Sequence, residues 1–277
     1  MRSPTAADPC GAGDPVPWGP TGATGGWARL SHGGCSLGTL GVNLLRLYAV
    51  VDRYRGGCTF VDLGVDHGVS SLALALDAVP RRNTVFGVDL TFSNLGFDLR
   101  SHPHYHRIRG DTVTVGRQWD RGCVDLVFID SLHVEPHVLS ELHAWFPHVR
   151  TGGTIIVHDT AWPEGSHDLR WHPGADATGV KWPTPDRAVA AFFGLEQQFA
   201  DAKHHGFHHV DDDIEVAHHP ESWGMTVIRR KSSRDLRANV GDWPRVFAQR
   251  TQVLCSLMDA ARLRWFGIDL GSAAAAS

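Results

Sequence analysis

The sequence has few cysteines, no basic stripe and no long apolar run. Its five cysteines stand far apart among 277 residues and form no Cys-x-x-Cys pair, which predicts reduced thiols in a cytoplasmic protein. No apolar run approaches the roughly 20 residues that a membrane helix requires. Residues 1–20 hold Asp, Pro and Gly where an export signal would carry charge and then an apolar stretch. We therefore expect a protein that is neither exported nor inserted into a membrane.

Positive charge is not in excess. The formal net charge is −4, and Arg and Lys are scattered among Asp, Glu and His. Such a chain offers no continuous basic surface for a phosphate backbone to follow, which argues against a nucleic-acid partner. Clefts focus the field of their own carboxylates, so the composition favours a cationic or a neutral polyhydroxylated small molecule.

The length suits one large domain with extended ends. Residues 1–36 are rich in Gly, Pro, Ser and Thr and predict a flexible arm or lid. Residues 37–232 form the expected domain, with an insertion at 161–183 that has neither helical nor strand periodicity. Residues 233–277 carry an apolar helical stripe that could dock on this core or on a second subunit, so a homodimer is one prediction.

Short apolar runs alternate with helical stretches from Cys58 onward. This order predicts an α/β fold with a doubly wound, mostly parallel, seven-stranded sheet. The expected strands are Cys58–Gly64, Thr84–Leu90, His106–Arg109, Val124–Asp130, Thr154–His158, Phe207–Val210 and Met225–Arg229. The expected helices are Leu37–Tyr54, Val69–Ala78, Phe92–Leu99, Val113–Arg117, Glu135–His148, Asp186–Ala200 and Asp242–Phe266.

An acidic residue and two glycines follow the first expected strand. Asp62, Gly64 and Gly68 give the pattern Asp-x-Gly-x-x-x-Gly, which differs from the Gly-x-Gly-x-x-Gly turn of dinucleotide folds. Glycines at this turn let the backbone bend and let a ligand approach. The acid favours a cationic ligand, and S-adenosylmethionine carries both an ammonium and a sulfonium. We include Asp66 and Ser70, which lie in the same turn, in the predicted cofactor site.

Two further strands end beside acids. Asp89, followed by Leu90, lies about 20 residues past the glycine turn, where a carboxylate can reach both ribose hydroxyls. Asp111 and Thr112 follow the third strand. Asp111 could accept from an adenine amine or simply cap the next helix. Both alternatives stay open on the sequence.

Taken together these residues resemble a known family. Asp62 to Ser70, Asp89, Asp111, the "FIDSLH" block ending at His133 and the "GGTIIVHDT" block ending at Thr160 look like a class I S-adenosylmethionine-dependent methyltransferase. Within that class they most resemble methyltransferase family 24 and the cephalosporin-hydroxylase-like and sugar methyltransferases. A gentamicin-type aminoglycoside N-methyltransferase is one member to suspect. The resemblance covers about residues 37–230 and implies fold and cofactor more specifically than acceptor.

Asp130 and Asp159 end the fourth and fifth expected strands. If these strands are neighbours, their carboxylates converge beside the methyl group, and Asp130 also touches the cofactor pocket. Two carboxylates can hold Mg²⁺. Some relatives use an acidic pair where this chain has His158 and Asp159, which weakens the magnesium prediction and leaves direct binding of a substrate ammonium as its rival.

Methyl transfer also requires removal of a proton from the acceptor. His133 and His158 are the candidate bases, because imidazole exchanges protons near neutral pH. The histidine pairs at 204–205, 208–209 and 218–219 lack the spacing of a zinc site and predict solvated surface. Tryptophans of the 161–183 insertion are candidates for the wall of an acceptor pocket, since sugar rings stack on aromatic faces.

The sequence thus predicts methyl transfer from S-adenosylmethionine to an amine or hydroxyl of a sugar-containing natural product, with an aminoglycoside amine as the leading acceptor. A Mg²⁺-dependent sugar O-methyltransferase is the alternative. A nicotinamide-dependent oxidoreductase would need a third glycine in the turn, where Ser70 stands. A noncatalytic cofactor-binding protein is the remaining possibility.

Overall fold

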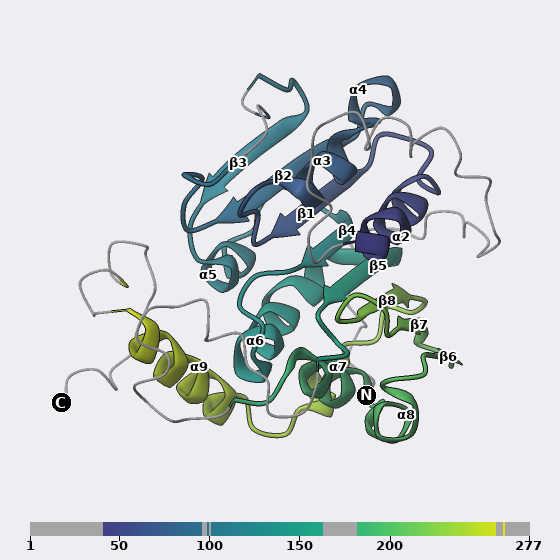
Figure 1. Cartoon of the computed structure of the whole chain (residues 1–277), viewed down its shortest axis with the longest axis vertical. Coiled ribbons are helices and arrows are strands. Elements are labelled where there is room, and N and C mark those ends of the chain that lie inside the picture. Colours follow the sequence, from purple (N-terminus) through teal and green to yellow (C-terminus); the bar gives the residue numbers. More distant parts are fainter. Residues whose placement is uncertain (1–40, 96–98, 100, 163–181, 259–262, 264–277) are drawn as a thin grey trace, which may run out of the picture.

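A computed structural model describes residues 41–95, 99, 101–162, 182–258 and 263 of the chain. They form an α/β fold around one sheet of eight strands in the order β3-β2-β1-β4-β5-β8-β7-β6 (Figure 1). The strands are β1 (Thr59–Leu63), β2 (Thr84–Asp89), β3 (Tyr105–Arg109), β4 (Val124–Ile129), β5 (Val149–His158), β6 (Phe207–Val210), β7 (Ile214–His219) and β8 (Met225–Arg230). The α-helices are α2 (Gly41–Val51), α3 (Val69–Ala75), α4 (Ala78–Arg81), α5 (Thr112–Arg117), α6 (Glu135–Trp145), α7 (Pro185–Phe193), α8 (Glu196–Ala202) and α9 (Trp243–Leu257).

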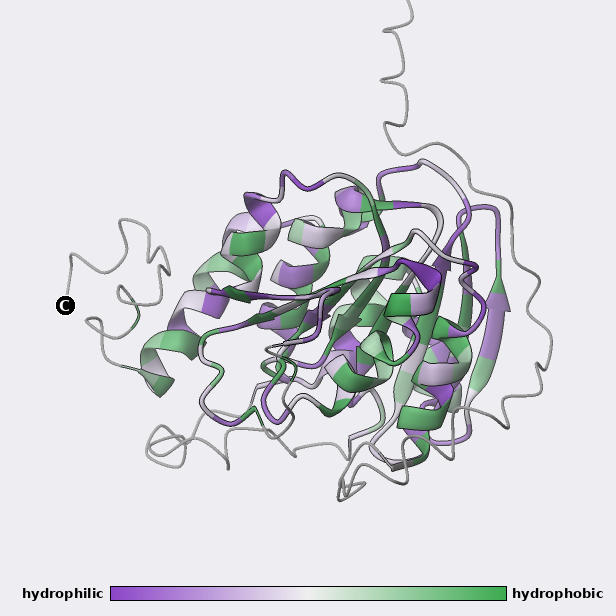
Figure 2. Cartoon of the chain, turned by 90° about the horizontal axis from the view of Figure 1, so that it is seen from above, coloured by the Kyte–Doolittle hydropathy of each residue, from purple (hydrophilic) through white to green (hydrophobic). Residues whose placement is uncertain are grey.

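The first five strands are parallel, and helices cover both of their faces. β1 lies between β2 and β4, and β4 lies beside β5. Apolar residues of α2, α3 and α4 pack on one face, and those of α5, α6, α7 and α9 pack on the other. Figure 2 shows the hydrophobic strands enclosed between helices of mixed hydropathy. The prediction of a doubly wound sheet is confirmed, and the carboxyl ends of β1, β2, β4 and β5 lie along one edge.

The other end of the sheet is antiparallel and contains a strand that the sequence prediction missed. β8 pairs with β5, and β7 lies between β8 and β6. The sheet therefore has eight strands, and the predicted number of seven is wrong. β7 has the sequence IEVAHH, in which buried and half-buried residues alternate. This alternation buries His218, so the prediction that its pair is solvated surface is wrong for that residue.

The helix predicted at Phe92–Leu99 is also wrong in its described part, where residues 92–95 are irregular around a turn at 93–94. Asp89 accepts from the Thr91 amide at 3.0 Å, and the Thr91 hydroxyl accepts from the Ser93 amide at 3.2 Å. Asp, Thr and Ser side chains that bond nearby amides compete with helix formation.

The C-terminal helix α9 docks on the chain's own core. It packs against α6, and its buried residues include Val246, Val253 and Leu254. Dimerisation through this helix stays a prediction, as do the domain limits at 37 and 232. The arm at 1–36 and most of the insertion, residues 163–181, lie outside the described residues. Within the described ranges, no helix combines the length and apolarity needed to cross a membrane.

Among the described cysteines, Cys123 differs from the prediction. Cys58 is free and buried, and Cys255 is free and exposed. Cys123 is disulfide-bonded, so the expectation that all five cysteines are reduced is wrong there.

Candidate functional site

The glycine turn after β1 packs against the backbone at the end of β4. Gly64 has a φ of 88°, and Gly68 has a φ of 82° and caps the start of α3. A Cβ built on Gly64 would lie 2.4 Å from the carbonyl oxygen of Asp130. The missing side chain therefore makes room for the backbone after β4, and the expectation that it makes room for a ligand is corrected at this glycine.

Asp62 lies at the base of this turn and is fully buried. Its Oδ2 accepts from the hydroxyls of Ser70, at 2.9 Å, and Ser71. Its Oδ1 has no hydrogen-bond partner in the described part of the chain. Burial raises the pKa of Asp62 to about 7, although both serine hydroxyls act against the rise. A buried carboxylate with one unpartnered oxygen suits a cationic group of a ligand.

Stability should therefore depend on the protonation of Asp62. Its folded pKa of about 7 lies above the ordinary aspartate pKa of 3.8, so the native state binds more protons between these values. The free energy of unfolding then falls as pH rises through this window, by at most about 1.4 kcal/mol for each pH unit. Asp62→Asn should remove this component. Urea unfolding from pH 4.5 to 7.5 should show the variant gaining stability relative to the parent protein as pH rises. An unchanged difference would contradict the raised pKa.

Asp89 holds the same turn from β2. Its Oδ2 accepts from the amides of Val65, at 2.8 Å, and Asp66, at 3.1 Å. Asp66 is exposed at a φ of 42°, and its side chain accepts from Asn94. The predicted ribose contact of Asp89 stays a prediction. What the contacts establish is that Asp89 orders the loop that would surround a nucleoside.

Asp111 is buried and caps α5. Its Oδ2 accepts from the amide and hydroxyl of Thr114, and its Oδ1 pairs with Arg250 of α9. The capping alternative is thus present, while a contact with adenine remains a prediction. Thr112 is buried beside it, and Leu90 packs on the apolar cluster between α9 and the end of β4.

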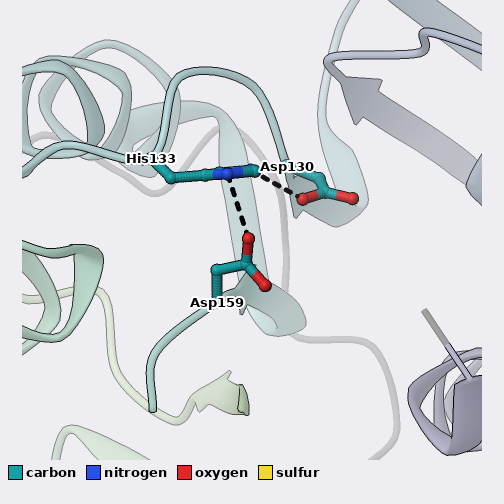
Figure 3. Close-up of side chains that lie close together, drawn as sticks. All are labelled: Asp130, His133 and Asp159. Atoms are coloured by element: carbon teal, nitrogen blue, oxygen red, sulfur yellow. Dashed lines mark hydrogen bonds and ion pairs between the residues drawn. The ribbon is translucent and has the colours of Figure 1, made fainter. Parts of the chain in front are cut away.

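Asp130, His133 and Asp159 meet at the ends of β4 and β5, and we call them the carboxylate–histidine cluster (Figure 3). His133 Nε2 lies 2.9 Å from Asp130 Oδ1, and its Nδ1 lies 3.0 Å from Asp159 Oδ2. An imidazole donates from both nitrogens only when it carries both protons. His133 can bond both carboxylates in this arrangement only as the imidazolium. The predicted convergence of Asp130 and Asp159 is confirmed.

His158 contacts both carboxylates of this cluster. Its Nδ1 lies 3.1 Å from Asp130 Oδ1 and 2.9 Å from Asp159 Oδ1. Its side chain is 2% exposed, against 17% for His133. Burial alone would lower the pKa of His158, but the two carboxylates outweigh it and raise the pKa to about 10. Of the two candidate bases, His133 is therefore the one that an acceptor can reach.

The pKa values of the two carboxylates shift downward, opposite to the shift of His158. Burial alone would raise their pKa values, but the histidines hold the pKa of both Asp130 and Asp159 below the usual range. Asp159 is in the left-handed region at a φ of 59°, which turns its side chain toward His133. Both acids are ionised at neutral pH.

The cluster also has the donors of a cation site. One atom from each of its three residues lies within 4.8 Å of the others. Two carboxylate oxygens suit Mg²⁺, and the imidazole nitrogen suits transition metals. The donor set fits a divalent cation, provided that His133 releases one of its hydrogen bonds. His133 is an addition to the predicted ligands Asp130 and Asp159.

Residues 61–160 match the family model of a methyltransferase domain. This range contains every predicted cofactor and catalytic residue. Residues 61–160 therefore resemble the core of a class I methyltransferase domain. The resemblance to methyltransferase family 24 is thereby confirmed for this part of the chain.

Known proteins resemble parts of the chain of different length. The demethylmacrocin O-methyltransferase of Streptomyces fradiae is 36% identical over 95 residues, which cover 30% of this chain and only 22% of that relative. The solved MycE methyltransferase of the mycinamycin pathway, in complex with Mg and SAH, is 18% identical with a TM-score of 0.45, covering 75% of this chain and 54% of its own. A putative caffeoyl-CoA O-methyltransferase from Staphylococcus aureus is 10% identical with a TM-score of 0.48, covering 74% and 96%.

Three residues near the site were missed from the sequence. Asn43 of α2 lies 3.4 Å from His158, Arg250 pairs with Asp111, and Trp223 lies in the β7–β8 turn close to Trp162. All three lie outside the methyltransferase motifs. Of the three, only Arg250 could have been identified from the sequence pattern, because it is a charged residue on the apolar stripe of the predicted C-terminal helix.

Proposed function

We propose that the chain transfers a methyl group from S-adenosylmethionine to a hydroxyl of a sugar-containing natural product. The observation that carries the proposal is the carboxylate–histidine cluster, placed at the edge of a methyltransferase domain beside the Asp62 turn. The cofactor would bind along the turn and Asp89, with its ammonium toward the unpartnered oxygen of Asp62. S-adenosylmethionine supplies an electrophilic methyl group on sulfur.

The chain's own residues prepare the acceptor. Asp130 and Asp159 bind and orient it so that its oxygen lies in line with the methyl group. An acceptor that hydrogen-bonds to one of these carboxylates displaces the hydrogen bond between that carboxylate and His133. The freed nitrogen then releases its own proton to solvent, and as a neutral acceptor it takes the hydroxyl proton, while the ring keeps its other proton on the remaining carboxylate. A divalent cation, held by Asp130, His133 and Asp159, would lower the pKa of the same hydroxyl.

An amine acceptor, such as an aminoglycoside amine, is the second candidate. Two ionised carboxylates at one site complement a substrate ammonium without any cation. His133 would then remove a proton from nitrogen.

Cofactor binding is the first test. Calorimetry should detect binding of S-adenosylhomocysteine and none of NAD. Asp89→Ala should weaken that binding by roughly 10- to 100-fold, because a charged hydrogen bond contributes about 1.5–3 kcal/mol. Asp89→Asn keeps one acceptor oxygen for the loop amides, so it distinguishes weaker binding caused by a disordered loop from weaker binding caused by a lost ribose contact. Tight binding of NAD alone would contradict the proposal.

Product analysis distinguishes the acceptors. Glycosylated macrolides and aminoglycosides should be incubated with methyl-labelled S-adenosylmethionine, with and without excess chelator. A methyl ether in the product identifies oxygen as the acceptor, and an N-methyl group identifies nitrogen. Activity that survives chelation would remove the cation from the mechanism.

A further inference from the structure

We propose that Trp223, together with Trp162, forms an aromatic wall on which the sugar ring of the acceptor stacks. This inference rests on the proposed function and adds a residue that lies outside the segment 61–160 matched by the family model. Trp223 is 44% exposed, which is unusual for a large apolar side chain in the described structure. Its ring centroid lies 5.5 Å from that of Trp162.

The two rings lead directly to the carboxylate–histidine cluster. The centroid of Trp162 lies 6.2 Å from that of His133. The three rings therefore run without a break from the candidate base to solvent. A pyranose ring placed against this wall would present its apolar C–H face to the indoles and one hydroxyl to His133.

The backbone holds Trp223 in this position against its own preference. Ser222 and Trp223 have φ angles of 52° and 71°, in the left-handed region that side chains disfavour. Two consecutive positive φ angles are those of a type I′ hairpin turn, which the Gly224 amide closes by donating to the Glu221 carbonyl at 3.1 Å, so the turn between β7 and β8 fixes the backbone of Trp223.

Contacts from two elements enforce it here. The amide of Ala161 donates to the carbonyl of Trp223 at 2.7 Å, which fixes the turn to the exit of β5. Asn43 Nδ2 of α2 donates to the carbonyls of Glu221 and Ser222, both at 3.0 Å. α2 and the β7–β8 hairpin lie side by side in Figure 1. The turn is thus anchored to the same strand end that carries Asp159.

Packing against the core would explain a buried tryptophan, but Trp223 presents nearly half of its surface to solvent. A protein partner would also use an exposed tryptophan. The continuity of the rings from His133 to Trp223 favours the acceptor over a partner, since a surface for a partner needs no connection to the cluster.

The test uses direct binding, so it does not depend on turnover. Saturation-transfer NMR with methyl α-D-glucopyranoside and methyl α-L-rhamnopyranoside should be recorded on the full chain with S-adenosylhomocysteine bound, saturating aromatic protons. We expect transfer to the sugar C–H protons in the parent protein and in Trp223→Phe. Trp223→Ala should reduce the transfer several-fold. Val79→Ala, at an apolar position that is 49% exposed on α4, is the matched control and should leave the signal unchanged.

The outcomes separate this inference from the proposed function. Loss of S-adenosylhomocysteine binding in the parent protein would overturn the proposed function itself. Normal cofactor binding with equal sugar signals in the parent protein and Trp223→Ala, or with no sugar signal in either, would overturn the aromatic wall alone. With the natural acceptor in hand, Trp223→Ala should raise KM about tenfold and change kcat little, because stacking holds the acceptor before and during the reaction.

Discussion

Replacing His133 with alanine is expected to lower kcat by roughly 10²–10⁴-fold, the usual contribution of a general base. His133 is the only histidine of the carboxylate–histidine cluster, and it is more exposed than His158. Its removal leaves Asp130 and Asp159 paired with His158 alone. The measurement is single-turnover methyl transfer at saturating cofactor and acceptor, so that binding does not mask the chemical step.

Two controls define this result. Binding of S-adenosylhomocysteine to His133→Ala should stay within a few-fold of the parent value, because His133 is not among the predicted cofactor residues. His209→Ala is the matched variant, since His209 also contacts an aspartate but lies on the remote strand β6. A kcat for His133→Ala close to that of the parent protein would remove it as the base.

A second experiment tests how His133 becomes a base. In the structure both nitrogens of His133 face carboxylates, so the ring is an acid until one carboxylate is taken up. Acceptor binding should therefore release a proton from the cluster. Calorimetry in two buffers of different ionisation enthalpy measures this release, and it should be absent in His133→Ala.

The positions of Asp62, Asp89, Asp130 and Asp159 could be predicted from the sequence because each lies at or just past the end of an apolar run. Such runs mark strands buried on both faces, and the order of parallel strands brings their carboxyl ends to one edge. The convergence of Asp130 and Asp159 followed from this rule without any knowledge of side-chain contacts.

Features that depend on contacts between distant segments could not be predicted in this way. Strand β7 has two histidines and a glutamate beside its apolar residues, so it lacks the continuous run that marked the parallel strands. Trp223 depends on a turn whose geometry is set by Asn43 and Ala161, which are remote in sequence. The role of Gly64 was mistaken because a glycine pattern does not reveal which neighbour occupies the space.

Arg250→Met is expected to lower the free energy of unfolding by about 3–5 kcal/mol, because breaking a buried ion pair leaves its partner charge uncompensated. Arg250 and Asp111 are 8% and 3% exposed at their side chains. The pair joins α9 to the start of α5, and Arg250 Nε also reaches His137 of α6 at 3.3 Å. Urea unfolding followed by circular dichroism measures the loss.

The double variant Arg250→Met with Asp111→Asn separates structure from cofactor binding at Asp111. Removing both charges should recover part of the lost stability, since asparagine still caps α5 and no buried charge remains unpaired. If Asp111 also contacts adenine, S-adenosylhomocysteine should bind more weakly to the double variant even after stability has recovered. If Asp111 only caps the helix, affinity should recover with stability. Measuring stability and affinity together thus distinguishes the two roles of Asp111 that the sequence left open, adenine contact and helix capping.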